Sequence, residues 1–286
     1  MTDRSVVVMG LPGSGKTTFL AALWHLVSEG ELDSKLTYVT LKTDNVAHLN
    51  HIAAVWREAR KPERTSVAGD RVVSMILQAR GGTPQTITFP DVAGEAFLQM
   101  WEERECDDTV ASWLNGPGVL FFIHADTIEA PKWVIDETLK SERLGIERET
   151  GVSVSWSPRL APTQVQVTDL LQSMQADPLD VGPRRLAIVL SAWDTVAEEG
   201  LSPEEYLREK LPLLHQFLKH GLHRQWDVRI YGVSAQGGDY DEENKEHAEA
   251  VALRDVDVPS KRIRVAYAGA NGESHDLTEP LQWLLT

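Results

Sequence analysis

Apolar residues along the chain alternate between short continuous runs and stretches in which they recur at helical spacing. The continuous runs, bounded by turn residues, predict buried strands at 5–9, 118–126, 185–191 and 227–233. The helically spaced stretches lie between and after them, and they predict helices at 16–29, 163–176, 202–221 and 277–286. Strands that alternate with helices indicate an α/β fold, a mostly parallel sheet with helices on both faces.

Three further segments interrupt this alternation. Residues 71–79 and 85–90 read as two strands joined by the turn "ARGGTP", which predicts a hairpin. A strand-like run at 36–43 is followed by a helical pattern that starts after Asp44, and a longer helix is predicted at about 94–114. We expect one domain over residues 1–286, with insertions at the following positions: about 31–60, 127–182 and 238–270. The acidic part of the last insertion, "GGDYDEENKEHAEA", is predicted to be a solvated loop.

The loop after the first strand, "GLPGSGKTT", carries the pattern G-x-x-x-x-G-K-[ST]. Glycines allow backbone N–H groups to turn toward phosphates where side chains would collide. Lys16 is expected to reach the β- and γ-phosphates, and the Thr17 hydroxyl to take one Mg²⁺ position. The predicted nucleotide-binding residues of this loop are Gly10, Gly13, Ser14, Gly15, Lys16, Thr17 and Thr18.

Three strand ends further along the chain narrow the choice of nucleotide. "TITFPDVAGEAF" places Asp91 where it can hold Mg²⁺ through water, and Gly94 where a bare N–H can meet a γ-phosphate. "RLAIVLSAWDTV" ends at Asp194, whose carboxylate could accept hydrogen bonds from guanine. "VRIYGVSAQGG" ends in Ser234-Ala235, where a backbone N–H could meet the guanine oxygen. Each motif alone fits an ordinary turn or helix cap, but their order along the chain is informative.

This set of motifs resembles a Ras-like P-loop GTPase domain. Within that class, "GLPGSGKTTFLAALW", "DVAGEAF" and "EPLQWLL" resemble the bacterial double-GTPase families of conflict and defence systems. The resemblance implies a Ras-like sheet, bound GTP or GDP, and Mg²⁺. The sequence departs from the GTPase pattern [NT]-K-x-D, because Ser191 and Ala192 stand where that pattern has Asn or Thr and Lys, before Trp193 and Asp194.

The resemblance also implies a first switch at about 61–67, "KPERTSV". Thr65 is the expected ligand of Mg²⁺ and the γ-phosphate, with Thr37, Thr40 and Thr43 as rivals. Arg64 is a candidate arginine finger, with a surface arginine as the plainer interpretation. Glu95 stands where many Ras-like enzymes carry a water-orienting glutamine, so slow intrinsic hydrolysis is expected.

Net charge and composition limit which classes of molecule the protein is expected to bind and where it is expected to reside. The formal net charge is −15, from 28 Lys and Arg against 43 Asp and Glu, which disfavours nucleic acid and anionic membranes. Neither a signal peptide nor a membrane-spanning run is evident, and the single cysteine rules out an intrachain disulfide. We expect a cytoplasmic protein.

The sequence therefore predicts a GTP-hydrolysing switch that signals to a protein effector or a second GTPase, with a nucleotide-dependent dimer as one form of that signal. Two alternatives remain open. A P-loop kinase of a small molecule would need lid arginines, which Arg143 and Arg148 could supply. A non-hydrolysing, nucleotide-bound scaffold would fit the missing switch glutamine.

Overall fold

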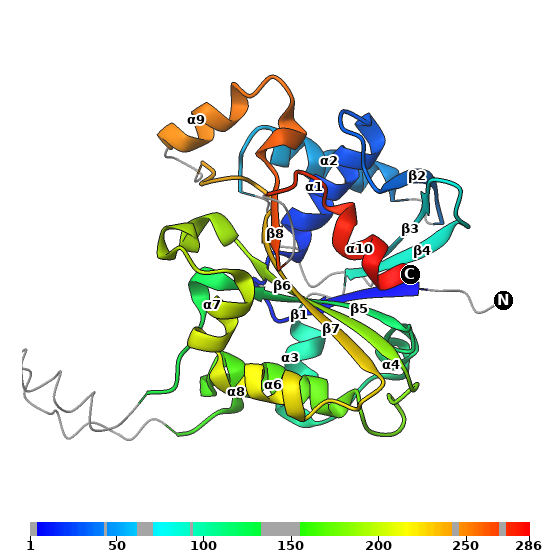
Figure 1. The fold of residues 1–286 in the computed structure, drawn as a ribbon, viewed down its shortest axis with the longest axis vertical. Helices are drawn as coiled ribbons and strands as arrows, with labels where there is room; N and C mark the ends of the chain where they lie inside the picture. Colours follow the sequence, from blue (N-terminus) through cyan, green and yellow to red (C-terminus); the bar gives the residue numbers. More distant parts are fainter. Residues whose placement is uncertain are drawn as a thin grey trace, which may run out of the picture.

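One eight-stranded sheet organises the protein (Figure 1). The computed structural model describes residues 5–42, 45–61, 71–91, 94–132, 155–241, 246–268 and 273–286. The strand order is β2-β3-β4-β1-β5-β6-β7-β8. The strands are β1 Ser5–Gly10, β2 Leu36–Leu41, β3 Arg71–Ala79, β4 Gln85–Asp91, β5 Gly118–His124, β6 Arg184–Ser191, β7 Trp226–Ser234 and β8 Arg264–Tyr267.

The five central strands, β4, β1, β5, β6 and β7, run parallel to one another. The two edges are antiparallel: β2 and β3 precede β4 as a meander, and β8 pairs with β7. The predicted mostly parallel α/β sheet is confirmed. Parallel strands of this kind are buried on both faces, which explains their continuous apolar runs.

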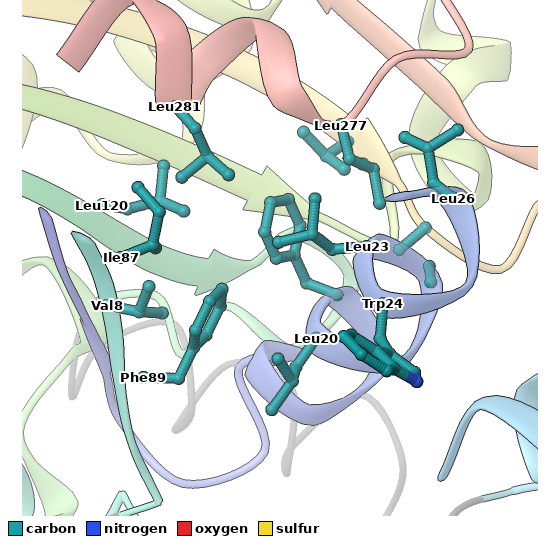
Figure 2. Packing of buried hydrophobic residues seen from close by; sticks show 14 of the residues in the cluster. Val8, Leu20, Leu23, Trp24, Leu26, Ile87, Phe89, Leu120, Leu277 and Leu281 are labelled. Atoms are coloured by element: carbon teal, nitrogen blue, oxygen red, sulfur yellow. The ribbon is translucent and has the colours of Figure 1, made fainter. Parts of the chain in front are cut away.

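Helices cover both faces of the sheet (Figure 1). The bounds are α1 Lys16–Glu29, α2 Val46–Arg57, α3 Glu95–Glu103, α4 Asp108–Leu114, α6 Thr163–Ser173, α7 Pro203–Lys210, α8 Pro212–His220, α9 Ala248–Arg254 and α10 Thr278–Leu285. Alternate residues of β1 serve the two resulting cores, since successive strand side chains point to opposite faces. Val6 and Val8 pack with α1, α2 and α10, whereas Val7 and Met9 pack with α3, α4, α6, α7 and α8. Figure 2 shows the first of these cores, where Val8 and Leu120 face leucines of α1 and α10.

Two helices predicted as continuous are each broken in the structure. The segment 94–114 divides into α3 and α4, because Arg104 adopts φ 60° at the end of α3 and the Asp107 carboxylate caps α4 by accepting a hydrogen bond from the Thr109 N–H at 2.8 Å. The segment 202–221 divides into α7 and α8 at Pro212, which has no N–H to continue the first helix.

The insertion at 238–270 holds two elements that the sequence analysis missed, α9 and the edge strand β8. The prediction that "GGDYDEENKEHAEA" is a loop is wrong for its last residues, because α9 begins at Ala248. In the other insertions, β2, α2 and α6 lie close to their expected positions. The division into one domain with insertions stays a prediction. Among the described helices, none has the length and apolarity needed to cross a bilayer.

We predict that Leu120→Ala lowers the free energy of unfolding by about 2–5 kcal/mol, because its side chain is fully buried between the central strands and α10. Urea denaturation followed by circular dichroism measures the loss. Val39→Ala on edge strand β2 is the control, since Val39 is exposed and its truncation should change stability by less than about 0.5 kcal/mol. Equal losses in the two variants would contradict the assignment of the core.

Candidate nucleotide site

The predicted motifs meet at one edge of the sheet. β4, β1, β6 and β7 belong to the parallel set, so their carboxyl ends point the same way. The loops after these four strands carry the four predicted motifs. Open α/β sheets bind ligands at this edge.

The phosphate loop links β1 to α1. Gly15 caps the start of α1 in a left-handed conformation, with φ 88°, and a Cβ on it would lie 2.8 Å from the Ser191 Oγ. Glycine is required there for both conformation and space. The first helical N–H groups and the positive end of the helix dipole therefore face the loop, an arrangement suited to phosphate.

The Lys16 ammonium lies over this loop. Its Nζ donates hydrogen bonds to the carbonyl oxygens of Gly10 at 2.8 Å and Leu11 at 2.9 Å, and to the Ser14 Oγ at 3.1 Å. The half-buried cation is therefore positioned by the loop backbone itself. Thr17 and Thr18 follow in the first turn of α1, half-buried, on the same side of the sheet.

Gly94, the glycine of the D-x-x-G motif, packs directly on the phosphate loop. A Cβ built on it would lie 2.3 Å from the Pro12 nitrogen and 2.6 Å from the Leu11 carbonyl carbon. No side chain fits between backbones this close, so only glycine allows the contact. α3 starts at the next residue, Glu95, whose side chain is exposed in the first helical turn.

The switch candidates Thr65, Arg64 and Thr43 lie outside the described part of the chain, as do Arg143 and Arg148, the candidate lid arginines of the kinase alternative. For Asp91, the structure gives the backbone, which closes β4, but not the side chain. The rival threonines Thr37 and Thr40 belong to β2, with β3 and β4 between that strand and β1. Their hydroxyls donate to the carbonyl oxygens of Gln78 and Leu41.

Ser191, which replaces Asn or Thr of the GTPase pattern, ties β6 to the phosphate loop. Its Oγ donates to the Ser14 carbonyl oxygen at 2.9 Å and lies 3.5 Å from the Ile123 carbonyl oxygen. In the sequence, Ser191 is visible only as a departure from the motif. The small hydroxyl fits against Gly15 and still makes a link between two strand ends.

Beyond Ser191, Asp194 stands in the first turn of the 3-10 helix Trp193–Glu199. Its position depends on Trp193, whose ring lies against Gly232 of β7 and stacks edge-on to Tyr206 at 5.4 Å. Asp194 lines a pocket of about 230 Å³ at the end of α1 nearest the loop. The other lining residues are Gly15, Thr18, Phe19, Phe122, His124, Asp126, Ser191, Ala192, Thr195, Val233, Ala235, Gln236, Gly238, Asp239 and Tyr240.

Of the predicted Ser234-Ala235 turn, Ala235 lines this pocket together with the next residue, Gln236. Ser234 is buried, and its Oγ accepts a hydrogen bond from the Gly237 N–H at 3.0 Å. The Trp56 indole N–H of α2 donates to the Ala235 carbonyl oxygen at 2.9 Å. The Gln236 amide nitrogen donates to the Trp56 carbonyl oxygen at 3.4 Å. The inserted helix α2 therefore supports the turn.

Arg262, buried behind Trp56, completes this support. Its guanidinium lies 4.2 Å from the centre of the indole ring and donates to the carbonyl oxygens of Trp56 at 3.0 Å and Arg57 at 3.2 Å. It also donates to the Leu253 carbonyl oxygen at 3.3 Å. Burial lowers the pKa of Arg262 to about 10, which leaves it charged at neutral pH. No local motif around Trp56 or Arg262 could have indicated this contact.

His124, the last residue of β5, and Asp126 just after it also line the pocket. Burial lowers the pKa of His124, although the carboxylates of Asp126 and Asp194 act in the opposite direction. The imidazole is therefore neutral at pH 7. Asp126 stands in the first turn of the short 3-10 helix Ala125–Thr127.

We predict that Trp56→Phe, which keeps a ring but removes the indole N–H, lowers the free energy of unfolding by about 1–3 kcal/mol, because the Ala235 carbonyl oxygen is left unsatisfied in a buried site. Urea denaturation measures the loss. Trp24→Phe is the matched control: its indole N–H donates at 2.9 Å to Asn50, an exposed side chain that water can satisfy. An equal or larger loss for the Trp24 variant would contradict the prediction.

Comparisons with known proteins give one family match and a set of distant structural likenesses. No curated protein sequence matches the chain. The GTP-bound Ski7 GTPase-like domain of S. cerevisiae is similar at 15% identity and a TM-score of 0.42, over 85% of this chain and 47% of that one. This chain thus spans about half the length of the Ski7 chain. The SRb-GTP/SRX signal recognition particle receptor complex of Chaetomium thermophilum is similar at 14% identity and a TM-score of 0.39, over 89% of this chain and 98% of that one.

Likenesses at these identities and TM-scores carry no argument about function. The family match is of another kind: the model of the family described as Double-GTPase 1 matches residues 7–284, from within β1 to within α10. That range includes every strand-end motif of the site. The chain belongs to the Double-GTPase 1 family.

Proposed function

We propose that this protein is a guanine-nucleotide switch that binds GTP, hydrolyses it to GDP with Mg²⁺, and passes the outcome to a protein partner. The observation that carries the proposal is the contact of Gly94 with the phosphate loop at Leu11 and Pro12. A glycine held there can direct its backbone N–H at the third phosphate. The presence or loss of that phosphate would then move the start of α3.

The chain's own groups divide the work of holding the nucleotide. Lys16 and the N–H groups at the start of α1 bind the phosphates, and Ser191 keeps the loop in place through the Ser14 carbonyl. At the other end of the pocket, Asp194 accepts hydrogen bonds from the guanine N–H groups. The Ala235 N–H meets the guanine oxygen, in a turn that Trp56 supports.

Mg²⁺ fits the donor types that lie beside the loop. Hard oxygen ligands suit this ion: the Thr17 hydroxyl at the start of α1 would bind it directly, and Asp91 at the end of β4 would hold it through a water. Thr65 completes the proposed set from outside the described residues. When bound, the ion neutralises charge on the β- and γ-phosphates.

Hydrolysis is proposed to be slow without a partner. Glu95, exposed at the first turn of α3, can accept a hydrogen bond from the attacking water. As a carboxylate it cannot donate one to the γ-phosphate. Slow hydrolysis implies that Arg64, the candidate arginine finger, does not act in cis and that a partner would supply the cation.

The proposed partner is a protein effector or a second GTPase, including a second copy in a nucleotide-dependent dimer. The net charge of −15 disfavours nucleic acid and anionic lipid. A cytoplasmic role in a bacterial conflict or defence system is part of the same proposal and rests on the family resemblance. The alternative of a small-molecule kinase is less favoured, because a kinase has less use for a D-x-x-G glycine that is packed on the phosphate loop and senses the third phosphate.

We predict that the protein binds GTP more tightly than ATP, and that Asp194→Ala weakens GTP binding roughly 10- to 100-fold, as expected for the loss of hydrogen bonds to a charged acceptor. ATP affinity should hardly change, because adenine presents a different edge. Calorimetric titration with each nucleotide measures both. Asp227→Ala is the control, an exposed carboxylate at the opposite end of β7. Equal affinity of the wild type for GTP and ATP would favour the kinase or a relaxed NTPase.

We predict that intrinsic GTP turnover is on the order of 10⁻⁴ s⁻¹, the scale of Ras-type switches without an arginine finger, and that Glu95→Gln raises it. The glutamine amide can orient water and also donate to the phosphate. Single-turnover hydrolysis measures the rate, with Glu103→Gln at the far end of α3 as control. If Arg64 acts in cis, the wild type will exceed this scale and Arg64→Ala will slow it. A fast wild type that is insensitive to Arg64→Ala would overturn the slow-switch proposal.

A further inference from the structure

The base end of the pocket lacks one of the surfaces that a planar base requires. Where the GTPase pattern has a lysine whose stem can cover the base, Ala192 presents only a methyl group. A purine has two large faces, and stacking on each contributes to binding. A pocket that holds a purine therefore needs another flat or apolar surface close to Asp194.

We propose that Tyr240 is the aromatic wall on which the base stacks, and that it is an affinity-determining residue of the nucleotide site. The inference rests on the proposed function and deepens it. Tyr240 lines the same pocket as Asp194, Ala235 and Gln236, and its side chain is half-buried rather than packed in the core.

The other aromatic rings that line this pocket, as far as the structure describes it, are committed to the core. Phe19 and Phe122 are 0% and 1% exposed and pack edge-to-face on each other at 5.0 Å. Phe19 also contacts Phe89 at 6.4 Å (Phe89 is labelled in Figure 2). Their rings are buried against each other and have no free face for a ligand. His124, the remaining ring, offers a smaller aromatic face than a phenol.

The backbone on both sides of Tyr240 is fixed. The Asp239 N–H donates to the Glu249 carboxylate at 3.2 Å. The Asp241 N–H donates to the Ala59 carbonyl oxygen at 2.9 Å, just beyond α2. The ring is therefore presented by a braced segment, and little entropy remains to be lost when a base binds.

The Asp241 side chain adds a second attachment. Its carboxylate accepts a hydrogen bond from the His247 N–H at 2.8 Å and forms an ion pair with Arg254 of α9. Arg254 in turn donates to the Glu58 carbonyl oxygen at 2.8 Å. The segment that carries Tyr240 thus joins α9 to the end of α2, the same helix that supports the Ala235 turn.

The phenol also suits a pocket that contains carboxylates. Burial raises the pKa of Tyr240, and the charges of Asp194 and Asp239 raise it further. The hydroxyl therefore stays protonated well above neutral pH and remains a hydrogen-bond donor. A neutral ring adds no negative charge where a nucleotide, itself an anion, must approach.

The test compares GDP binding by the wild type, Tyr240→Ala, Tyr240→Phe and the control Tyr38→Ala, by calorimetric titration. Tyr38 is a half-buried tyrosine on edge strand β2 that packs on Trp24, away from the pocket. Loss of base stacking should weaken GDP binding roughly 5- to 150-fold in Tyr240→Ala. Tyr240→Phe should recover most of that loss because it restores the ring. Inorganic tripolyphosphate, which has no base, should bind wild type and Tyr240→Ala alike.

Wild-type GDP affinity in Tyr240→Ala would overturn the inference, as would an equal loss of tripolyphosphate binding, which would indicate a disturbed loop. An equal loss in Tyr38→Ala would overturn it as well, by showing a general effect on the fold. The proposed function can fail independently of this inference. A wild type that binds ADP and not GDP would refute the guanine assignment. Titration of the same variants with ADP would then still test whether the base stacks on Tyr240. A wild type that binds no nucleotide would overturn both.

Discussion

The backbone of the phosphate loop is packed against its neighbours so closely that no side chain fits between them, and the rest of the site depends on this constraint. Gly15 lies against Ser191, and Gly94 lies against Pro12. Three separate strand ends are thereby held in contact, those of β1, β4 and β6. Because protein interiors are dense and yield little, a shift of any one of them must move the others. The same packing that makes a rigid cradle also connects it to α3.

The sequence was most informative where a residue type is required by backbone geometry. Glycines at positions 15 and 94, a lysine at 16 and apolar runs before each loop are such cases, so the sheet and the place of the site could be predicted. Boundaries set by single local events were missed: Pro212 begins a new helix, and Arg104 ends one with φ 60°. β8 could not be predicted either, because its four residues carry too little pattern.

The base end of the site was read from the sequence only in part, for a different reason. Asp194, Ser234 and Ala235 have local signatures, but what supports them does not. Trp56 and Arg262 are 206 residues apart, and each looks unremarkable among its neighbours in the sequence. Trp56, on the inserted helix α2, contacts both the turn after β7 and Arg262 of the later insertion. Insertions that seemed peripheral to the domain therefore build one wall of the pocket.

The contact between Trp56 and Arg262 also means that the two ends of the pocket depend on segments synthesised at different times. Gly10, Lys16 and Gly94 lie within the first hundred residues, and Ser191 completes the phosphate end, so this end can assemble before Arg262 has been made. The base end requires Arg262 to reach Trp56, and it must therefore wait until nearly all of the protein has been made. Contacts between distant segments form late because they close long loops. The two ends of one binding pocket therefore form at different stages of synthesis, the phosphate end first and the base end last.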